Sequence, residues 1–411
     1  MENPKIRFKG FTKDWEQRRF GEITELKSAS RVHKDEWTSN GVPFYRSSDV
    51  MTAINGTENE KAFISEELYE KLSKVSGKLE EGDILVTGGG SVGNPYIVPD
   101  NKPLYTKDAD LLWIKNKGKF HPYFLYEFFF SPTFRNYLGS ISHVGTIAHY
   151  TITQLSDTPI GLPIFEEQKE VGEYFQSLDR LITLHQRKCD QTKNLKKYML
   201  QKMFPQNGAK VPEIRFDGYT YDWEQRKLID YLEVSSEKNR DNRFTKDDVL
   251  SVSGEYGIVN QIEFQGRSFA GASVSNYGVV ENGDVVYTKS PLKSNPYGII
   301  KTNKGIPGIV STLYAVYKPK EITDSKFVQI YFELDSRMNS YMHPLVNKGA
   351  KNDMKVSAEN ALKGMVSFPK KDEQEMISLY FSNLDHLITL HQRKCDELKK
   401  MKKYMLQNMF I

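Results

Sequence analysis

The sequence lacks the features of a secreted or membrane protein. Its 411 residues include two cysteines, Cys189 and Cys395, which cannot build a disulfide framework. The longest apolar cluster, Tyr123–Phe130, is too short to span a bilayer and contains Glu127. The N-terminal MENPKIRFKGF has no apolar signal-peptide core. We therefore expect a cytoplasmic protein without a membrane segment, whose net charge of +4 permits an anionic partner.

Catalytic signatures are also missing. GGGSVG at Gly88–Gly93 is not followed by the Gly-Lys-Ser/Thr of a phosphate-binding loop. Asn-Pro-Tyr occurs at Asn94 and Asn295, but each copy lacks one proline of the adenine-methyltransferase motif, and no cofactor loop accompanies it. Nucleophile-elbow, HExxH and Pro-Asp…Glu-x-Lys patterns do not occur. We therefore expect a non-catalytic chain, without catalytic residues and without a bound cofactor. The alternative of a stand-alone methyltransferase or nuclease would need one of these patterns.

The strongest positive feature is an internal repeat. Leu178–Phe204 and Leu384–Phe410 are identical at 21 of 27 positions. An opening motif, defined by Pro4–Arg18 and Pro212–Arg226, is identical at 11 of 15 positions. The stretches between them diverge, apart from GDILVT and GDVVYT. The predicted segments are a first variable domain with its opening motif (1–162), a central helix (163–205), a second variable domain with its motif (206–367) and a C-terminal helix (368–411).

Both repeated segments predict long helices. Apolar residues recur at alternating steps of three and four, as in a coiled-coil seam, and no proline occurs from Glu166 to Phe204. Such a helix would be about 58 Å long. We predict an antiparallel coiled coil with pseudo-two-fold symmetry, whose length sets the separation of the variable domains. The residues expected to form this spacer and to dock partner subunits are Phe175, Leu178, Ile182, Phe381, Leu384 and Ile388.

Each predicted helix carries a histidine and a cysteine four residues apart, His185 with Cys189 and His391 with Cys395. Together they could form a Cys₂His₂ zinc site, or they could fill the seam as packing residues. The spacing differs from the short loops that usually present zinc ligands, so we favour packing and expect no metal. The second half of each helix is basic and includes Lys196 and Lys402. This predicts a solvated face, or alternatively a surface for phosphates or an acidic partner.

The variable domains predict an α+β fold. Short β-type runs with glycine and proline between them precede helical patches in both domains. Polar and basic loops interrupt the strands, and such side chains suit phosphates and base edges. The predicted DNA-binding residues are Arg46, Ser47, Ser48, Thr87, Gly88, Gly89, Ser91, Lys115, Lys117, His143 and His149 in the first domain, and Lys238, Arg240, Arg243, Thr288, Lys289, Ser290, Lys293, Asn295, Lys351 and Asn352 in the second.

Four segments of the chain together resemble the specificity subunit of type I restriction-modification enzymes. They are the opening motif PxIRFxGFTxDWEQR, the GDILVT segment, P-x₃-EQ and LDxLITLHQRK…LKKYMLQxMF. The resemblance covers the whole chain, except that Cys189 and Cys395 stand where leucine is expected, which favours their packing role. It implies two target-recognition domains that each read half of a split, asymmetric site in double-stranded DNA.

The resemblance also implies partners: two methyltransferase subunits, which use S-adenosylmethionine to methylate a flipped adenine, and two restriction subunits, which use ATP and Mg. None of that chemistry would belong to this chain. The remaining alternative, a coiled-coil scaffold that does not bind DNA, would leave two large variable domains unexplained. The sequence does not predict the target bases.

Overall fold

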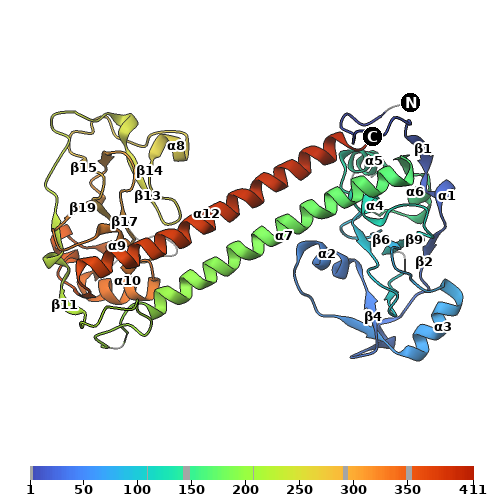
Figure 1. Cartoon of the computed structure of the whole chain (residues 1–411), viewed down its shortest axis with the longest axis horizontal. Coiled ribbons are helices and arrows are strands. Elements are labelled where there is room, and N and C mark those ends of the chain that lie inside the picture. The colour runs from blue at the N-terminus through green and yellow to red at the C-terminus, as the bar shows by residue number, and fades with distance from the viewer. Residues whose placement is uncertain (1–2, 109, 142–148, 207, 290–294, 349–353) are drawn as a thin grey trace. The chain divides into compact units, whose positions relative to one another are not determined.

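The computed structural model describes residues 3–108, 110–141, 149–206, 208–289, 295–348 and 354–411. The chain divides into two compact units: unit 1 comprises Met1–Gln186 and Gln392–Ile411, and unit 2 comprises Arg187–His391. Both divisions fall inside the long helices α7 (Phe165–Lys202) and α12 (Lys371–Asn408), so each unit contains part of both (Figure 1). The two long helices are therefore confirmed, whereas the domain boundaries at 162, 205 and 367 stay predictions.

Unit 1 contains ten short strands and six short helices besides its parts of α7 and α12, counted over its described residues. They are β1 (Glu16–Arg19), α1 (Phe20–Ile23), β2 (Leu26–Ser28), β3 (Trp37–Thr38), β4 (Val42–Tyr45), α2 (Ser47–Asn55), β5 (Ala62–Ile64), α3 (Glu66–Ser76), β6 (Ile84–Thr87), β7 (Pro95–Ile97), β8 (Tyr105–Thr106), β9 (Leu111–Ile114), α4 (Pro122–Phe128), α5 (Pro132–Ile141), α6 (Ile152–Asp157) and β10 (Pro159–Leu162).

Unit 2 has a similar order of elements. They are β11 (Glu224–Lys227), β12 (Leu232–Val234), β13 (Leu250–Ser253), β14 (Gly257–Asn260), α8 (Gln261–Gln265), β15 (Gly278–Val280), β16 (Val285–Thr288), β17 (Ile300–Thr302), β18 (Gly308–Val310), β19 (Tyr314–Pro319), α9 (Ser325–Tyr331), α10 (Asp335–Met342), β20 (Asn347–Lys348), β21 (Met354–Lys355), α11 (Ala358–Ala361) and β22 (Met365–Phe368).

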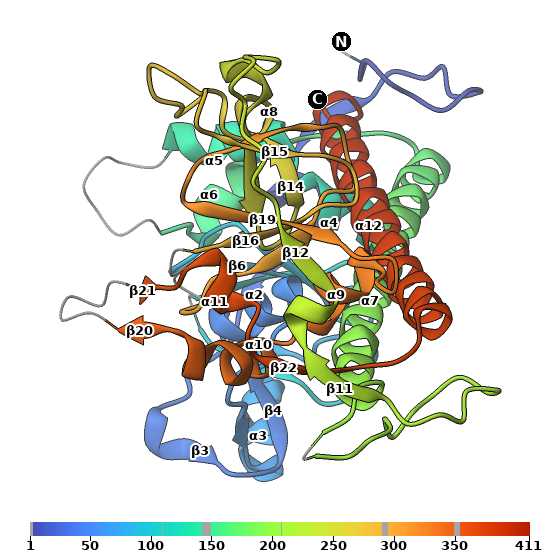
Figure 2. The ribbon, with the colours of Figure 1, turned by 90° about the vertical axis from the view of Figure 1, so that its left-hand side faces the viewer.

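The two units share one sheet topology despite their divergent sequences. The central antiparallel sheet has the order β2-β9-β6-β7 in unit 1 and β12-β19-β16-β17 in unit 2. Figure 2 labels the strands β12, β19 and β16 of the unit 2 sheet. The strand that ends each opening motif pairs with the strand that precedes the long helix, β1 with β10 and β11 with β22. The units differ in their inserts, defined as residues 29–82 with 98–106 in unit 1, with sheet β3-β5-β4-β8, and 235–280 with 303–313 in unit 2, with the pairs β13–β14 and β15–β18. The predicted α+β fold with an internal repeat is thus confirmed.

Each central sheet has two buried faces. In β6, Ile84 and Val86 pack into a core with helices α4 and α7, while Leu85 between them packs against the insert. This follows from the alternation of side chains along a strand. In β16, Val285 and Tyr287 pack toward α9 and the long helices, and Val286 faces the insert. One face of each sheet therefore fixes the domain to the helices, and the other carries the divergent insert.

The opening motif holds the start of the long helix through a buried ion pair. Arg7 donates from Nε and Nη2 to the two carboxylate oxygens of Glu167 at 2.6 and 2.8 Å. Arg215 bonds Glu373 in the same way at 2.8 and 2.8 Å. The Glu167 side chain is fully buried and that of Glu373 is 3% exposed. The glutamate of P-x₃-EQ is therefore the partner of the motif's arginine in both units.

The same motif also holds the end of the other long helix. The ring of Trp15 lies 6.4 Å from that of Phe410, just after α12, and the ring of Trp223 lies 5.9 Å from that of Phe204, just after α7. Backbone hydrogen bonds accompany these contacts: Ile6 N–H donates to the Asn408 carbonyl at 2.9 Å, and Ile214 N–H to Lys202 at 3.0 Å. In each unit the motif thus connects two helix ends that are distant in sequence.

The long helices pack against each other in antiparallel fashion within each unit. In unit 1 the Cys395 Sγ lies 3.9 Å from the Ile182 carbonyl, and in unit 2 the Cys189 Sγ lies 3.8 Å from the Ile388 carbonyl. Both cysteine side chains are fully buried, so they contribute to the packing of the seam. Among the residues that the structure describes, no group of three or more His, Cys, Asp or Glu side chains is placed to hold a metal ion.

A buried lysine connects both helices to the domain. In unit 1, Lys402 Nζ lies 2.8 Å from a Glu127 carboxylate oxygen at the end of α4 and 2.7 Å from one of Asp179. Unit 2 repeats the arrangement. There Lys196 Nζ lies 2.7 Å from a carboxylate oxygen of Glu333 and 2.6 Å from one of Asp385. The expectation of a solvated basic face is therefore wrong for Lys196 and Lys402, whose side chains are 12% and 17% exposed.

Replacing Arg7 with methionine should destabilise unit 1. The substitution would leave the buried Glu167 carboxylate unpaired, and breaking a buried pair in this way typically costs about 3–5 kcal/mol. The double variant Arg7→Met/Glu167→Met should recover most of the loss, because neither charge remains. Denaturant unfolding measures both, with Lys78→Met at the exposed Lys78–Glu70 pair as the control. Equal losses in the single and double variants would contradict the analysis.

The stability of unit 1 should also depend on pH through Glu127. Burial raises the pKa of Glu127 to about 8; Lys402 opposes the increase and Asp179 adds to it. An unfolded glutamate has a pKa near 4.3. The folded state therefore retains the proton on Glu127 between about pH 4.3 and 8, where the unfolded state loses it. As a result, the contribution of Glu127 to the free energy of unfolding falls as pH rises through that window. The decrease is at most about 1.4 kcal/mol per pH unit. Denaturation at several pH values should show a flatter profile for Glu127→Gln, while Glu70→Gln, at an exposed carboxylate, keeps the wild-type slope.

Candidate nucleic-acid and subunit interfaces

The glycine-rich loop after β6 is fixed by its own hydrogen bonds. Thr87 is fully buried; its hydroxyl donates to the Ser91 carbonyl and accepts from Asn94 N–H at 2.9 Å. Gly88 and Gly89 are buried as well, and Gly88 N–H donates to the Asp110 carbonyl at 2.8 Å. Of the four DNA-binding residues predicted here, only Ser91 is exposed. Thr87, Gly88 and Gly89 therefore shape the loop rather than offer side chains to a ligand.

Arg46, Ser47 and Ser48 lie at the start of α2. Arg46 Nε donates to Asp49 Oδ2 at 2.9 Å, and Ser47 Oγ donates to the Asp110 carbonyl at 3.0 Å. Burial would raise the pKa of Asp49, but hydrogen bonds from Arg46 and Asn59 outweigh it and hold the pKa below its ordinary value. Ser48 is exposed. Arg46 thus neutralises a buried carboxylate, and Ser48 is the accessible member of the group.

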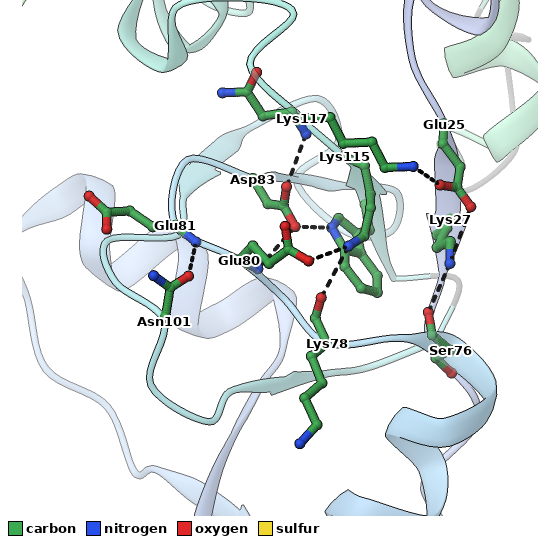
Figure 3. Close-up of polar contacts among 12 residues, drawn as sticks. Glu25, Lys27, Ser76, Lys78, Glu80, Glu81, Asp83, Asn101, Lys115 and Lys117 are labelled. Atoms are coloured by element: carbon green, nitrogen blue, oxygen red, sulfur yellow. Dashed lines mark hydrogen bonds and ion pairs between the residues drawn. The ribbon is translucent and has the colours of Figure 1, made fainter.

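The two lysines after β9 pair with carboxylates of unit 1, Lys115 in the interior and Lys117 at the exposed surface (Figure 3). Lys115 is 7% exposed; its Nζ lies 4.9 Å from the centre of the Trp113 ring and 3.2 Å from a Glu80 carboxylate oxygen. Lys117 Nζ lies 2.8 Å from a Glu25 carboxylate oxygen. Burial places Lys115 in the core, so a direct contact with DNA is not available to it in this arrangement.

Asn-Pro-Tyr anchors a loop in both units. Arg135 Nη2 in α5 donates to Asn94 Oδ1 at 3.0 Å, and in unit 2 Asn295 Nδ2 donates to Asp335 Oδ1 in α10 at 2.6 Å. Thr288 is buried, and its hydroxyl accepts from Ile299 N–H at 2.8 Å. The motif therefore connects the residue before β7 to α5 in unit 1 and Asn295 to α10 in unit 2.

Unit 2 offers more accessible cations. Lys238 and Arg240 are exposed, while Arg243 Nη1 pairs with Glu281 Oε1 at 3.0 Å. Lys289 is partly buried; this burial, and secondarily the charge of Lys238, lower its pKa. In unit 1 His149 is exposed. His143, Ser290, Lys293, Lys351 and Asn352, also predicted to bind DNA, lie outside the described residues.

Sequence reasoning missed an exposed apolar cluster on the insert of unit 2. The rings of Tyr256 and Phe264 lie 5.5 Å apart and are 62% and 45% exposed. Phe269 (55% exposed) and Leu313 (64% exposed) line a neighbouring groove of about 390 Å³. The guanidinium of Arg267 lies 4.5 Å from the Phe269 ring centre. The four apolar residues are separated by polar stretches in the sequence, so no periodic signal marks them.

The residues predicted to dock partners are mostly buried. Phe175 and Phe381 are fully buried, Leu178 and Leu384 are 5% and 6% exposed, and Ile182 and Ile388 are half-buried. They pack the helices to each other and to the domains, so their side chains offer little surface to a partner.

A different set of helix residues is exposed, which we call the outer apolar stripe. At 100° per residue, its members lie between about 80° and 180° around the helix from the buried cysteine of the same helix. They are Leu181, Leu184, Met401 and Tyr404 in unit 1, and the matching Leu387, Leu390, Leu195 and Tyr198 in unit 2, each 42–57% exposed. A repeated exposed apolar surface of this kind is typical of a protein–protein interface.

Comparisons with known proteins agree with this architecture. Residues 12–194 match the family model of the type I restriction modification DNA specificity domain. The MjaX type I restriction enzyme specificity subunit of Methanocaldococcus jannaschii is 24% identical over 424 residues, which cover 96% of this chain and 92% of the relative. The specificity subunit S.HindORF215P of Haemophilus influenzae is 26% identical over 170 residues, and the match covers 40% of each chain.

Solved structures show the same fold. The S subunit of the type I restriction-modification system from M. genitalium superposes with a TM-score of 0.60 at 13% identity, covering 100% of this chain and 99% of the other. A chain from a structure on complex assembly and conformational transition of the type I R-M system has a TM-score of 0.50 at 16% identity, covering 96% and 97%. Residues 12–194 therefore match a type I restriction modification DNA specificity domain, and with its duplicated sheets and long helix pair the whole chain has the fold of the M. genitalium S subunit.

Proposed function

We propose that this chain is the sequence-specific DNA-binding subunit of a type I restriction-modification complex, and that it reads a bipartite, asymmetric site. The carrying observation is that one sheet topology occurs twice with two different inserts. The side of each sheet that faces the helices is built alike, whereas the strands of the inserts pair differently, as one four-stranded sheet in unit 1 and as two two-stranded pairs in unit 2. Two different insert surfaces, each attached to the helices through the same face of its sheet, suit two different half-sites in DNA.

The chain acts with partners. Its DNA ligand is double-stranded, and its protein partners are methyltransferase and restriction subunits. We propose two of each, because the outer apolar stripe occurs once in each unit with nearly the same residues. S-adenosylmethionine, ATP and Mg would bind to those partners and not to this chain. The expected cytoplasmic location stays a prediction; none of the described helices is long and apolar enough to cross a membrane.

The alternatives make different predictions. A stand-alone methyltransferase would transfer a labelled methyl group from S-adenosylmethionine without any partner, and a stand-alone nuclease would cut DNA. A scaffold without DNA binding would leave the affinity of the complex for DNA unchanged when the inserts are altered. The Asn-Pro-Tyr loops, which resembled part of a methyltransferase motif, hold their asparagines in structural hydrogen bonds, which supports a non-catalytic chain.

Exchanging the domain of unit 1 should change one half of the methylated site. Residues 20–160 would be replaced by the matching segment of a relative, so that the opening motif and both long helices remain. Methylation-sensitive long-read sequencing of DNA from cells with the complete system would report the methylated motif. Exchange of residues 228–365 is the matched control and should change the other half only. A change in both halves, or in neither, would show that the domains are not independent readers.

Replacing the exposed Arg240 with alanine should weaken DNA binding by the assembled complex in a salt-dependent way. If Arg240 contacts a phosphate, the slope of log affinity against log salt should fall by about 1, and all DNA sequences should be affected alike. Lys115→Met is the contrasting variant: since Lys115 is bound inside unit 1, it should lower the thermal stability and leave the salt slope unchanged. Fluorescence anisotropy titrations at several salt concentrations measure both; an unaltered slope for Arg240→Ala would remove this residue from the interface.

A further inference from the structure

The last strand of the opening motif is exposed along its whole length in both units. All four residues of β1 and all four of β11 are exposed, and the first three, Glu-Gln-Arg, are identical in the two copies. Within the described residues, each strand pairs on one edge only, with β10 or with β22. The other edge and the side chains are therefore free to meet another molecule.

The two copies present these side chains in the same way. Glu16 and Arg18 lie on one face of β1 and form an ion pair of 3.5 Å, with side chains that are 53% and 51% exposed. Glu224 and Arg226 form the same pair on β11, with side chains that are 51% and 48% exposed. Each unit thus displays a carboxylate beside a guanidinium, at nearly equal exposure.

Folding does not account for this repetition. Other identical residues of the motif have partners inside the chain, as Arg7 has Glu167 and Trp15 has Phe410. An exposed ion pair contributes little to the free energy of folding. Exposure alone does not keep a residue of the motif identical, since Lys9 corresponds to Asp217 and Lys13 to Tyr221, although the exposed Thr12 and Asp14 recur as Thr220 and Asp222. Identity at the exposed Glu-Gln-Arg therefore points to one kind of molecule that contacts both units.

The strand continues toward the outer apolar stripe. Gly161, which pairs with Gln17, lies against the side chain of Ile411, directly after α12. Tyr404 and Met401, two members of the stripe, are exposed one to three turns before that end of the helix. A protein that covers the stripe of unit 1 would therefore extend naturally onto β1.

We propose that β1 and β11 form a second docking site for the methyltransferase subunit, one site in each unit, next to the outer apolar stripe. This inference rests on the proposed function. The complementary surface is a protein that presents a carboxylate to the arginine and a cation or amide donor to the glutamate. DNA fits this surface less well, because the glutamate next to each arginine repels phosphate.

A charge exchange within the strand tests the proposal. The double variant Glu16→Arg/Arg18→Glu keeps an exposed ion pair in β1 but reverses what a partner meets. Binding of the purified methyltransferase subunit to the full-length chain would be measured by native mass spectrometry and titration. We expect the affinity at one of the two sites to fall at least tenfold, while the melting temperature of the chain stays unchanged. Glu224→Arg/Arg226→Glu should weaken the other site. Lys9→Asp, which gives the first copy the residue of the second at an exposed position of the motif, should leave both sites unchanged.

Three results would overturn the proposal. The first is wild-type affinity at both sites in the two exchanged variants, and the second is an equal loss of affinity for Lys9→Asp. The third is a loss of DNA affinity with methyltransferase binding intact, which would assign the strand to DNA. Failure of the proposed function is distinguishable from these. In that case the wild-type chain itself would bind no methyltransferase subunit, or its complex would show no preference among DNA sequences.

Discussion

Two buried arginine–glutamate pairs determine how the repeated parts of the chain fit together. Glu167 and Glu373 lie in the first turn of the long helices with almost no solvent contact, so each needs a cation in a fixed place. Arg7 and Arg215 supply it from the opening motifs. Since the same motif packs its tryptophan against the end of the other helix, pairing the glutamate also brings the two helix ends together in each unit.

Once the helix ends are held, the variable domain needs only a few fixed contacts. Lys402 bonds both the partner helix and Glu127 of the domain, and one face of the central sheet packs against the same helices. Lys196 does the same with Glu333 in unit 2. The opposite face of each sheet carries the insert, which has no part in holding the helices. Divergence of the inserts is therefore compatible with a constant helix pair, because the two depend on different faces of one sheet.

Local and repeated signals in the sequence predicted the architecture well. The heptad-like spacing predicted both long helices, which end within three residues of the expected positions, and the repeat predicted two equivalent domains. The site was harder to predict, because burial depends on contacts between distant residues. Lys115 is covered through Lys78 and Glu80, about 35 residues away in the chain, and Lys196 through Glu333. A lysine in a polar stretch looks accessible until its partner is known. The exposed side chains of Phe269 and Leu313 were not predicted either, because nothing in the sequence next to them indicates that they remain accessible to solvent.

Comparing the two copies separates residues by what constrains them. Identical buried residues, such as Trp15 and Trp223, are explained by packing inside the chain. Identical exposed residues, such as Tyr198 and Tyr404, are not explained in this way, and a repeated exposed apolar surface is typical of a protein–protein interface. The exposed residues of the inserts differ even in kind: unit 2 displays aromatic rings, whereas the one large apolar side chain exposed in the described part of the unit 1 insert is Val75. Two chemically different surfaces on one scaffold are what reading an asymmetric site requires, because a symmetric pair of surfaces would favour two equal half-sites.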